Sequence, residues 1–273
     1  MKFSVGIFIL LIFIPMSVRA VDVNFHQAYY GKHCLSERSD VATALNALLF
    51  GPPEFSHLHD NLLSFGESRL DRARYLSQEF VIFAEKEQLP PVATFSKWYT
   101  RQFASQGNIH LNLDLVYLQG GGILDNFFNR VRYSLSKDIG VVLVLDHYAV
   151  EDTGEGRMNW NRRGRHFVLV TDMVLRTKDA FGFMVELIDP SNPNGELIRS
   201  YVLKRVGDPR VRMGQSRSDD PWINLTEDHL TIHGHNLDTG SRASWAQRQL
   251  VVPSWAIMSK SGNLDSEDSD AAE

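Results

Sequence analysis

The sequence contains a single cysteine, Cys34, among its 273 residues. A disulfide within the chain and a zinc site built from several cysteines are therefore excluded. The chain also lacks an excess of positive charge, because 28 lysines and arginines stand against 33 aspartates and glutamates, for a net charge of −5. A surface that holds nucleic acid phosphates needs the opposite balance, so we expect no nucleic acid partner.

Long apolar runs are absent beyond the first twenty residues. Lys2 precedes an apolar stretch over residues 3–16, and Val18-Arg19-Ala20 has the small-residue pattern of a cleavage site. The stretch is shorter than the ~20 apolar residues that a membrane-spanning helix needs. We therefore expect residues 1–20 to be a signal peptide cleaved after Ala20, and a secreted or periplasmic protein with no stable membrane insertion after cleavage.

Composition favours a folded chain with one core. Hydrophobic residues make up 43% of the sequence and charged residues 22%, which is typical of globular domains. Acidic residues and serines dominate residues 259–273, a composition that favours disorder. We expect one catalytic domain over residues 21–258 and a disordered acidic tail over residues 259–273.

Hydrophobic periodicity places helices mainly in the first half of the chain and strands in the second. Apolar residues at helical spacing predict helices over 35–50, 68–87, 95–105 and 124–135. Apolar runs predict strands over 109–115, 140–145, 167–170, 183–188 and 201–203, and the polar, glycine-rich residues 151–165 predict a surface loop. This layout predicts an α+β fold in which a helical N-terminal half packs on a C-terminal antiparallel sheet.

Three residues in this layout suggest nucleophilic catalysis. Cys34 precedes the first predicted helix, whose N-terminal partial charge and N–H groups favour the thiolate. His166 opens a predicted strand and can serve as a general base, and Asp189 ends the next strand, 23 residues later, where a carboxylate can orient the imidazole. Taken singly, a packed cysteine, a loop-end histidine and an Asp-Pro turn explain the same residues.

Gln27 lies seven residues before Cys34 and is a candidate oxyanion donor. Its side-chain amide, together with the backbone N–H of Cys34, can stabilise the negative charge that develops when a thiolate attacks a carbonyl. A solvated glutamine is the alternative.

The order of these residues resembles that of the papain-like cysteine peptidase superfamily, and most closely the phytochelatin synthases and their bacterial relatives. The resemblance spans residues 25–203 and rests on Leu45-Asn46-Ala47-Leu48 in the first helix, Gly164-Arg165-His166, and Leu187-Ile188-Asp189. Two departures stand out: Leu35 occupies a position that is glycine in the family, and Asp189-Pro190 fits the neighbouring C39-like peptidases better.

The resemblance implies a papain-like fold and a Cys34, His166, Asp189 triad, with Gln27 at the oxyanion. It also implies a thioester acyl-enzyme, no cofactor, and cysteine-dependent amide hydrolysis or acyl transfer on glutathione or a related small thiol peptide. A C39-like enzyme would instead cleave a peptide, often near a double glycine.

Two further hypotheses remain open from the sequence. His229, His233 and His235 lie in a strand-like stretch, and His233 and His235 share a face there, as metal ligands often do. Solvated histidines explain the same pattern and are the interpretation that we favour, so we expect no metal ligands among the site residues. The absence of glycine after Cys34 is also compatible with a catalytically inactive binding module.

Overall fold

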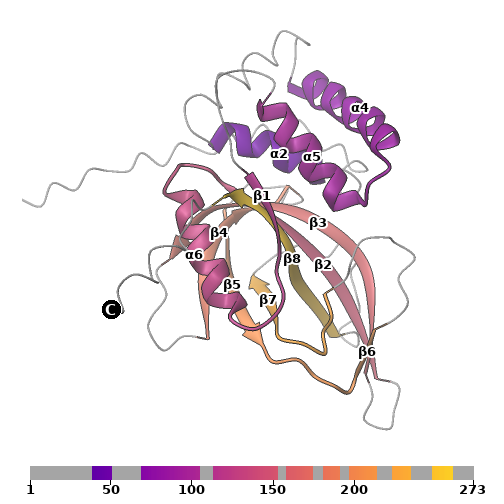
Figure 1. Ribbon diagram of the computed structural model, residues 1–273, viewed down its shortest axis with the longest axis vertical. Helices are drawn as coiled ribbons and strands as arrows, with labels where there is room; N and C mark the ends of the chain where they lie inside the picture. The colour runs from indigo at the N-terminus through magenta and orange to yellow at the C-terminus, as the bar shows by residue number, and fades with distance from the viewer. Residues whose placement is uncertain are drawn as a thin grey trace, which may run out of the picture.

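The computed structural model describes residues 39–50, 69–104, 113–152, 158–174, 181–190, 197–213, 223–234 and 248–260. Within these ranges the chain forms helices and a large antiparallel sheet (Figure 1). The helices are α2 (Ser39–Phe50), α4 (Arg69–Glu87), α5 (Pro91–Ala104) and α6 (Ile123–Leu135). The strands are β1 (Leu113–Tyr117), β2 (Val141–Asp152), β3 (Met158–Val174), β4 (Gly182–Ile188), β5 (Ile198–Arg205), β6 (Val211–Met213), β7 (His229–Gly234) and β8 (Arg248–Ser259).

The sheet has the strand order β1-β8-β2-β3-β4-β5-β7, with β6 paired in parallel to the start of β3. All other pairings are antiparallel among the described strands, and the long β2–β3 hairpin forms the centre. A β-bridge between Gln119, just after β1, and His229 of β7 joins the two edges of the sheet at one end. The sheet is therefore strongly curved and partly closed.

Helices cover both faces of the sheet, and side-chain alternation along β2 separates the two cores. Val142 and Val144 belong to the core formed with α2, α4 and α5, whereas Val141, Leu143 and Leu145 belong to the core formed with α6. We call these two surfaces the α2 face and the α6 face. In Figure 1, α2, α4 and α5 form a group above the sheet and α6 lies at its side.

Aromatic side chains attach the helical layer to β3. Phe95 of α5 is fully buried, and its ring centroid lies 4.8 Å from that of Phe167 on β3. Phe80 of α4 contacts both Phe95 (6.0 Å) and Trp98 (5.2 Å) in edge-to-face arrangements. Such pairs stabilise a core by about 0.5–1.5 kcal/mol beyond their buried area. The group fixes the helices next to the middle of β3.

The predicted fold class is wrong, although the predicted helices correspond to α2, α4, α5 and α6. The protein is mostly an antiparallel sheet, not a helical half packed on a sheet. Residues 158–165, predicted as part of a surface loop, form the first half of β3, and β8 was not predicted at all. In addition, β1 comes from the predicted helical half, and α6 covers the opposite face from the other helices.

The ends of the described chain bear on two further predictions. Strand β8 continues through Ser259, whose N–H donates to Ser134 Oγ at 3.1 Å, so the first residue of the predicted tail belongs to the sheet. The remaining tail residues and the predicted signal peptide lie outside the described residues. No helix within the described ranges is both long enough and apolar enough to cross a membrane.

Candidate active site

His166 and Asp189 meet at the point where β4 ends beside β3. His166 Nε2 lies 2.5 Å from Asp189 Oδ1, and both residues are buried, with exposed fractions of 7% and 1%. The contact follows from the sheet register, because Leu169 of β3 pairs with Ile188, the last residue of β4. Asp189 therefore leaves the sheet close to the side chain of His166.

This contact determines which nitrogen of the imidazole carries the hydrogen. An ionised carboxylate only accepts hydrogen bonds, so in the neutral ring Nε2 donates to Asp189 and Nδ1 keeps the lone pair. Among the described residues, no side chain or backbone group makes a hydrogen bond to Nδ1 of His166. The ring is thus oriented as a base whose accepting atom is Nδ1.

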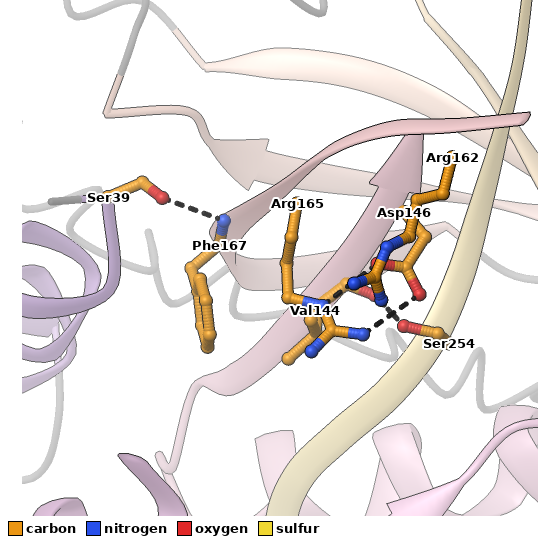
Figure 2. Close-up of polar contacts among 7 residues, drawn as sticks. All are labelled: Ser39, Val144, Asp146, Arg162, Arg165, Phe167 and Ser254. Atoms are coloured by element: carbon orange, nitrogen blue, oxygen red, sulfur yellow. Dashed lines mark hydrogen bonds and ion pairs between the residues drawn. The ribbon is translucent and has the colours of Figure 1, made fainter. Parts of the chain in front are cut away.

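The first turn of α2 binds the β3 backbone at the residue after His166. The N–H of Phe167 donates to Ser39 Oγ (3.1 Å), and Thr43 Oγ1 donates to the carbonyl of Phe167 (2.9 Å). Both hydrogen bonds are buried. The N-terminal turn of α2 is therefore held against the strand that carries the imidazole (Figure 2).

These two hydrogen bonds occupy an edge of β3 that β4 does not cover. Pairing between β3 and β4 stops at Leu169 and Ile188, and the N–H and C=O of Phe167 point to the same edge two residues earlier. The hydroxyls of α2 thus take the place of β4 as backbone partners. The helix start, the end of β4 and His166 converge at this edge.

A buried ion-pair cluster lies on the α2 face of the β2–β3 hairpin, opposite the face that carries the His166 side chain. Asp146 of β2 is fully buried and accepts from Arg165 Nε (2.8 Å) and Nη2 (3.2 Å), with Arg162 Nη1 at 3.8 Å. Figure 2 shows Phe167 and Arg165 pointing to the same side of β3. Since Asp146 pairs with Arg165 across the hairpin, the cluster locks the β2–β3 register beside His166. Burial and the charge of Asp146 raise the pKa of the Tyr148 hydroxyl, which stays protonated.

The structure brings together two of the four predicted site residues, His166 and Asp189. Cys34 and Gln27 lie outside the described residues. His166 does not open its strand as predicted, because β3 begins at Met158. It occupies the middle of a long strand, three residues before Leu169, where the pairing with β4 ends.

The alternative of a metal site at His229, His233 and His235 finds no support within the described part of the chain, where no group of three or more His, Cys, Asp or Glu side chains is arranged to hold a metal. His229 Nδ1 donates to the carbonyl of Glu227 (2.8 Å), and His233 Nε2 lies 3.1 Å from Thr231 Oγ1. Burial lowers the pKa of both rings, and Arg205 adds to this effect. His235 lies outside the described residues.

Sequence reasoning missed Asp146, His147 and Arg165. A signal for them exists in the pattern Asp146-His147 and Arg165-His166, in which a charged residue precedes a histidine in each of two strands that pair. Alternation in an antiparallel pair places the charged residues on one face and the histidines on the other. The segment that contains Arg165 was predicted to be a loop, which concealed this relationship.

Comparisons of the chain with protein-family models, with curated proteins and with solved structures find no match.

Proposed function

We propose that this chain is a cysteine-dependent amide hydrolase or acyl transferase in which Cys34 is the nucleophile, His166 the base and Asp189 the residue that orients the base. The observation that carries the proposal is the buried 2.5 Å contact between His166 Nε2 and Asp189 Oδ1. A histidine whose second nitrogen is fixed by a carboxylate is the arrangement that activates a thiol or hydroxyl nucleophile.

The position of α2 supports Cys34 as the source of the thiol. Cys34 is five residues before Ser39 in the sequence, and Ser39 is bonded to the residue after His166. Five residues of chain span at most about 17 Å. At Phe167 the edge of β3 is bonded by Ser39 and Thr43 of α2 where β4 no longer pairs, so the start of α2 lies at the edge of the strand that carries His166. Cys34 is also the only cysteine in the sequence.

The reaction then proceeds in two halves. The thiol proton moves to His166 Nδ1 and the sulfur attacks the amide carbonyl. The C–N bond breaks as the imidazolium returns the proton to the leaving amine, which leaves a thioester on Cys34. Water or a second amine attacks the thioester, with His166 again taking its proton, and the thiol is restored. Gln27 is proposed to donate to the oxyanion in both halves.

The substrate class comes from the resemblance of the sequence to phytochelatin synthases. Glutathione or a related small thiol peptide is the proposed acyl donor, cleaved with loss of glycine. The acceptor is water or the amine of a second thiol peptide.

The chemistry is tested by alkylation of the single cysteine. Iodoacetamide modification of Cys34, followed by mass spectrometry, is compared in the wild type, His166→Ala and the matched control His233→Ala. We expect rapid modification of the wild type and of the control at about pH 6, where an ordinary thiol with a pKa near 8.5 is protonated. His166→Ala should react at least about tenfold more slowly, because it lacks the base. Equal rates in all three proteins would refute the proposed role of His166.

The substrate is tested separately by incubation with glutathione. Release of glycine by the wild type, and none by Cys34→Ala, is the expected result. If His166-dependent alkylation is present but no glycine is released, the catalytic residues stand and glutathione is the wrong substrate.

A further inference from the structure

His147 of β2 is the aromatic neighbour of His166 on the α6 face. The two ring centroids lie 6.4 Å apart with an interplanar angle of 60°, an edge-to-face arrangement. The register explains this contact, because Leu145 pairs with His166 and His147 pairs with Gly164. Leu145, His147 and His166 therefore share one face of the hairpin.

Gly164 of β3 is the residue that pairs with His147 across the hairpin. The residue opposite His147 has no side chain, and a Cβ built at Gly164 meets nothing within 4 Å. No side chain at that position packs between His147 and the space beside His166. His147 thus comes from the strand on one side of β3, and Asp189 follows the strand on the other side, and both contact the His166 ring.

A histidine ring without such neighbours has rotational freedom that would disturb the proposed chemistry. The χ2 torsion of histidine is broad and roughly twofold, and a half-turn puts Cε1 in the place of Nε2 and Cδ2 in the place of Nδ1. That rotation would turn Nε2 away from Asp189 and move Nδ1 out of the position in which it serves as the proposed base. An aromatic edge packed against the ring restricts the rotation.

We infer that His147 is a positioning residue whose ring holds His166 in the orientation that joins Nε2 to Asp189 and leaves Nδ1 available. The inference adds a role to the proposed function and rests on it for its catalytic consequence. The orientation of His166 is itself a property of the folded protein that is measured without substrate.

The decisive measurement is the proton NMR resonance of His166 Nε2–H. A hydrogen in an N–H···O contact of 2.5 Å is strongly deshielded and resonates far downfield of the amide protons. The signal is assigned by its loss in Asp189→Asn. His147→Ala should broaden or abolish it, whereas His147→Phe, which keeps an aromatic ring at the same place, should retain it. His233→Ala is the matched control and should leave it unchanged.

Two results overturn the inference: a wild-type resonance in His147→Ala, or its loss in a folded His147→Phe protein. Circular dichroism and a urea titration establish that each variant is folded, and His147→Phe decides the matter if His147→Ala does not fold. Cys34 alkylation provides the catalytic readout, with a loss of about tenfold expected in His147→Ala and about twofold or less in His147→Phe. If Cys34 is alkylated no faster in the wild type than in His166→Ala, the proposed function is refuted. The His166 Nε2–H resonance would still decide whether His147 orients the ring.

Discussion

The Oγ of Ser39 accepts a hydrogen bond from the N–H of Phe167, the residue that follows His166 in the chain. The two partners are 128 residues apart in sequence. Through this bond the helix that follows Cys34 is fixed to the strand that carries the proposed base. The position of the helix start relative to His166 therefore depends on one hydroxyl and, through Thr43, on a second.

Removing these hydroxyls should loosen the attachment of α2. Ser39→Ala leaves the buried N–H of Phe167 without its partner, which costs about 1–3 kcal/mol of unfolding free energy. Thr43→Val should cost a similar amount through the carbonyl of Phe167. Urea titration measures both. Ser136→Ala, which removes an exposed hydroxyl bonded to the Tyr133 carbonyl, is the control and should change stability by less than about 0.5 kcal/mol. A loss in Ser39→Ala no larger than in this control would show that the attachment is unimportant.

Asp189→Asn should keep the proposed base, His166, but remove the carboxylate that orients its ring. An amide in this place can present either an oxygen or an N–H to His166 and no longer specifies which nitrogen carries the hydrogen. By analogy with such changes in serine-nucleophile triads, turnover should fall about 10²- to 10⁴-fold. The rate of Cys34 alkylation and the release of glycine from glutathione are the measurements. The control is Asp172→Asn. Asp172 is an exposed aspartate on β3, the strand of His166, and it accepts from the Met173 N–H. This variant should leave the alkylation rate and the release of glycine unchanged.

The pairing of His166 with Asp189 was predictable from sequence because each lies in or next to a strongly apolar segment. Once the two strands are neighbours, the contact needs only the end of β4 to fall near His166. The extent of β3 was not predictable in the same way. Residues 158–165 contain arginines and asparagines, because this half of the hairpin surrounds the Asp146 cluster and contributes Trp160 to a small apolar cluster with Tyr148. A pattern based on hydrophobic residues interprets such a segment as a loop.

Strand β8 escaped prediction for a different reason. It contains Pro253, which removes a backbone donor and is unusual within a sheet. The structure accommodates it at a register shift, where β2 passes from Val144 paired with Trp255 to Leu145 paired with Pro253. The extra residue, Ser254, donates its hydroxyl to the Val144 carbonyl at 3.3 Å. Because β8 inserts between β1 and β2, missing this strand concealed the true extent of the sheet, and with it the fold class.

The Asp146 cluster should be a major determinant of stability. Asp146→Ala leaves the guanidinium of Arg165, which is 13% exposed, without the carboxylate that it contacts through two nitrogens. Breaking a buried pair in this way typically costs about 3–5 kcal/mol. The free energy of unfolding from urea titration tests this value. Glu186→Ala breaks the pair with Arg199, which is 71% exposed, and serves as the control with a loss of at most about 1 kcal/mol. Similar losses in the two variants would contradict a structural role for the buried cluster.

His229 should make the fold sensitive to mild acid. Its ring is buried, and burial together with Arg205 lowers its pKa below the usual 6.5 in the folded protein, against the smaller opposing effects of the Glu227 carbonyl and Asp228. Above pH 6.5 the ring is neutral in both the folded and the unfolded chain, so it contributes no pH dependence. As the pH falls through 6.5 the unfolded chain gains a proton that the folded chain resists, and the free energy of unfolding decreases.

The matching variant is His229→Gln, whose side chain does not titrate. At pH 7.5 we expect it to be less stable than the wild type, because it loses the 2.8 Å hydrogen bond from Nδ1 to the Glu227 carbonyl. Between pH 7.5 and 5 that difference should shrink, since only the wild type meets the cost of protonating a buried imidazole. Urea titrations at several pH values measure it. The control is His233→Gln, at an exposed position of the same strand, whose difference in unfolding free energy from the wild type should change less with pH. A difference for His229→Gln that stays constant across this range would mean that the His229 ring is protonated in the folded protein as readily as in the unfolded chain.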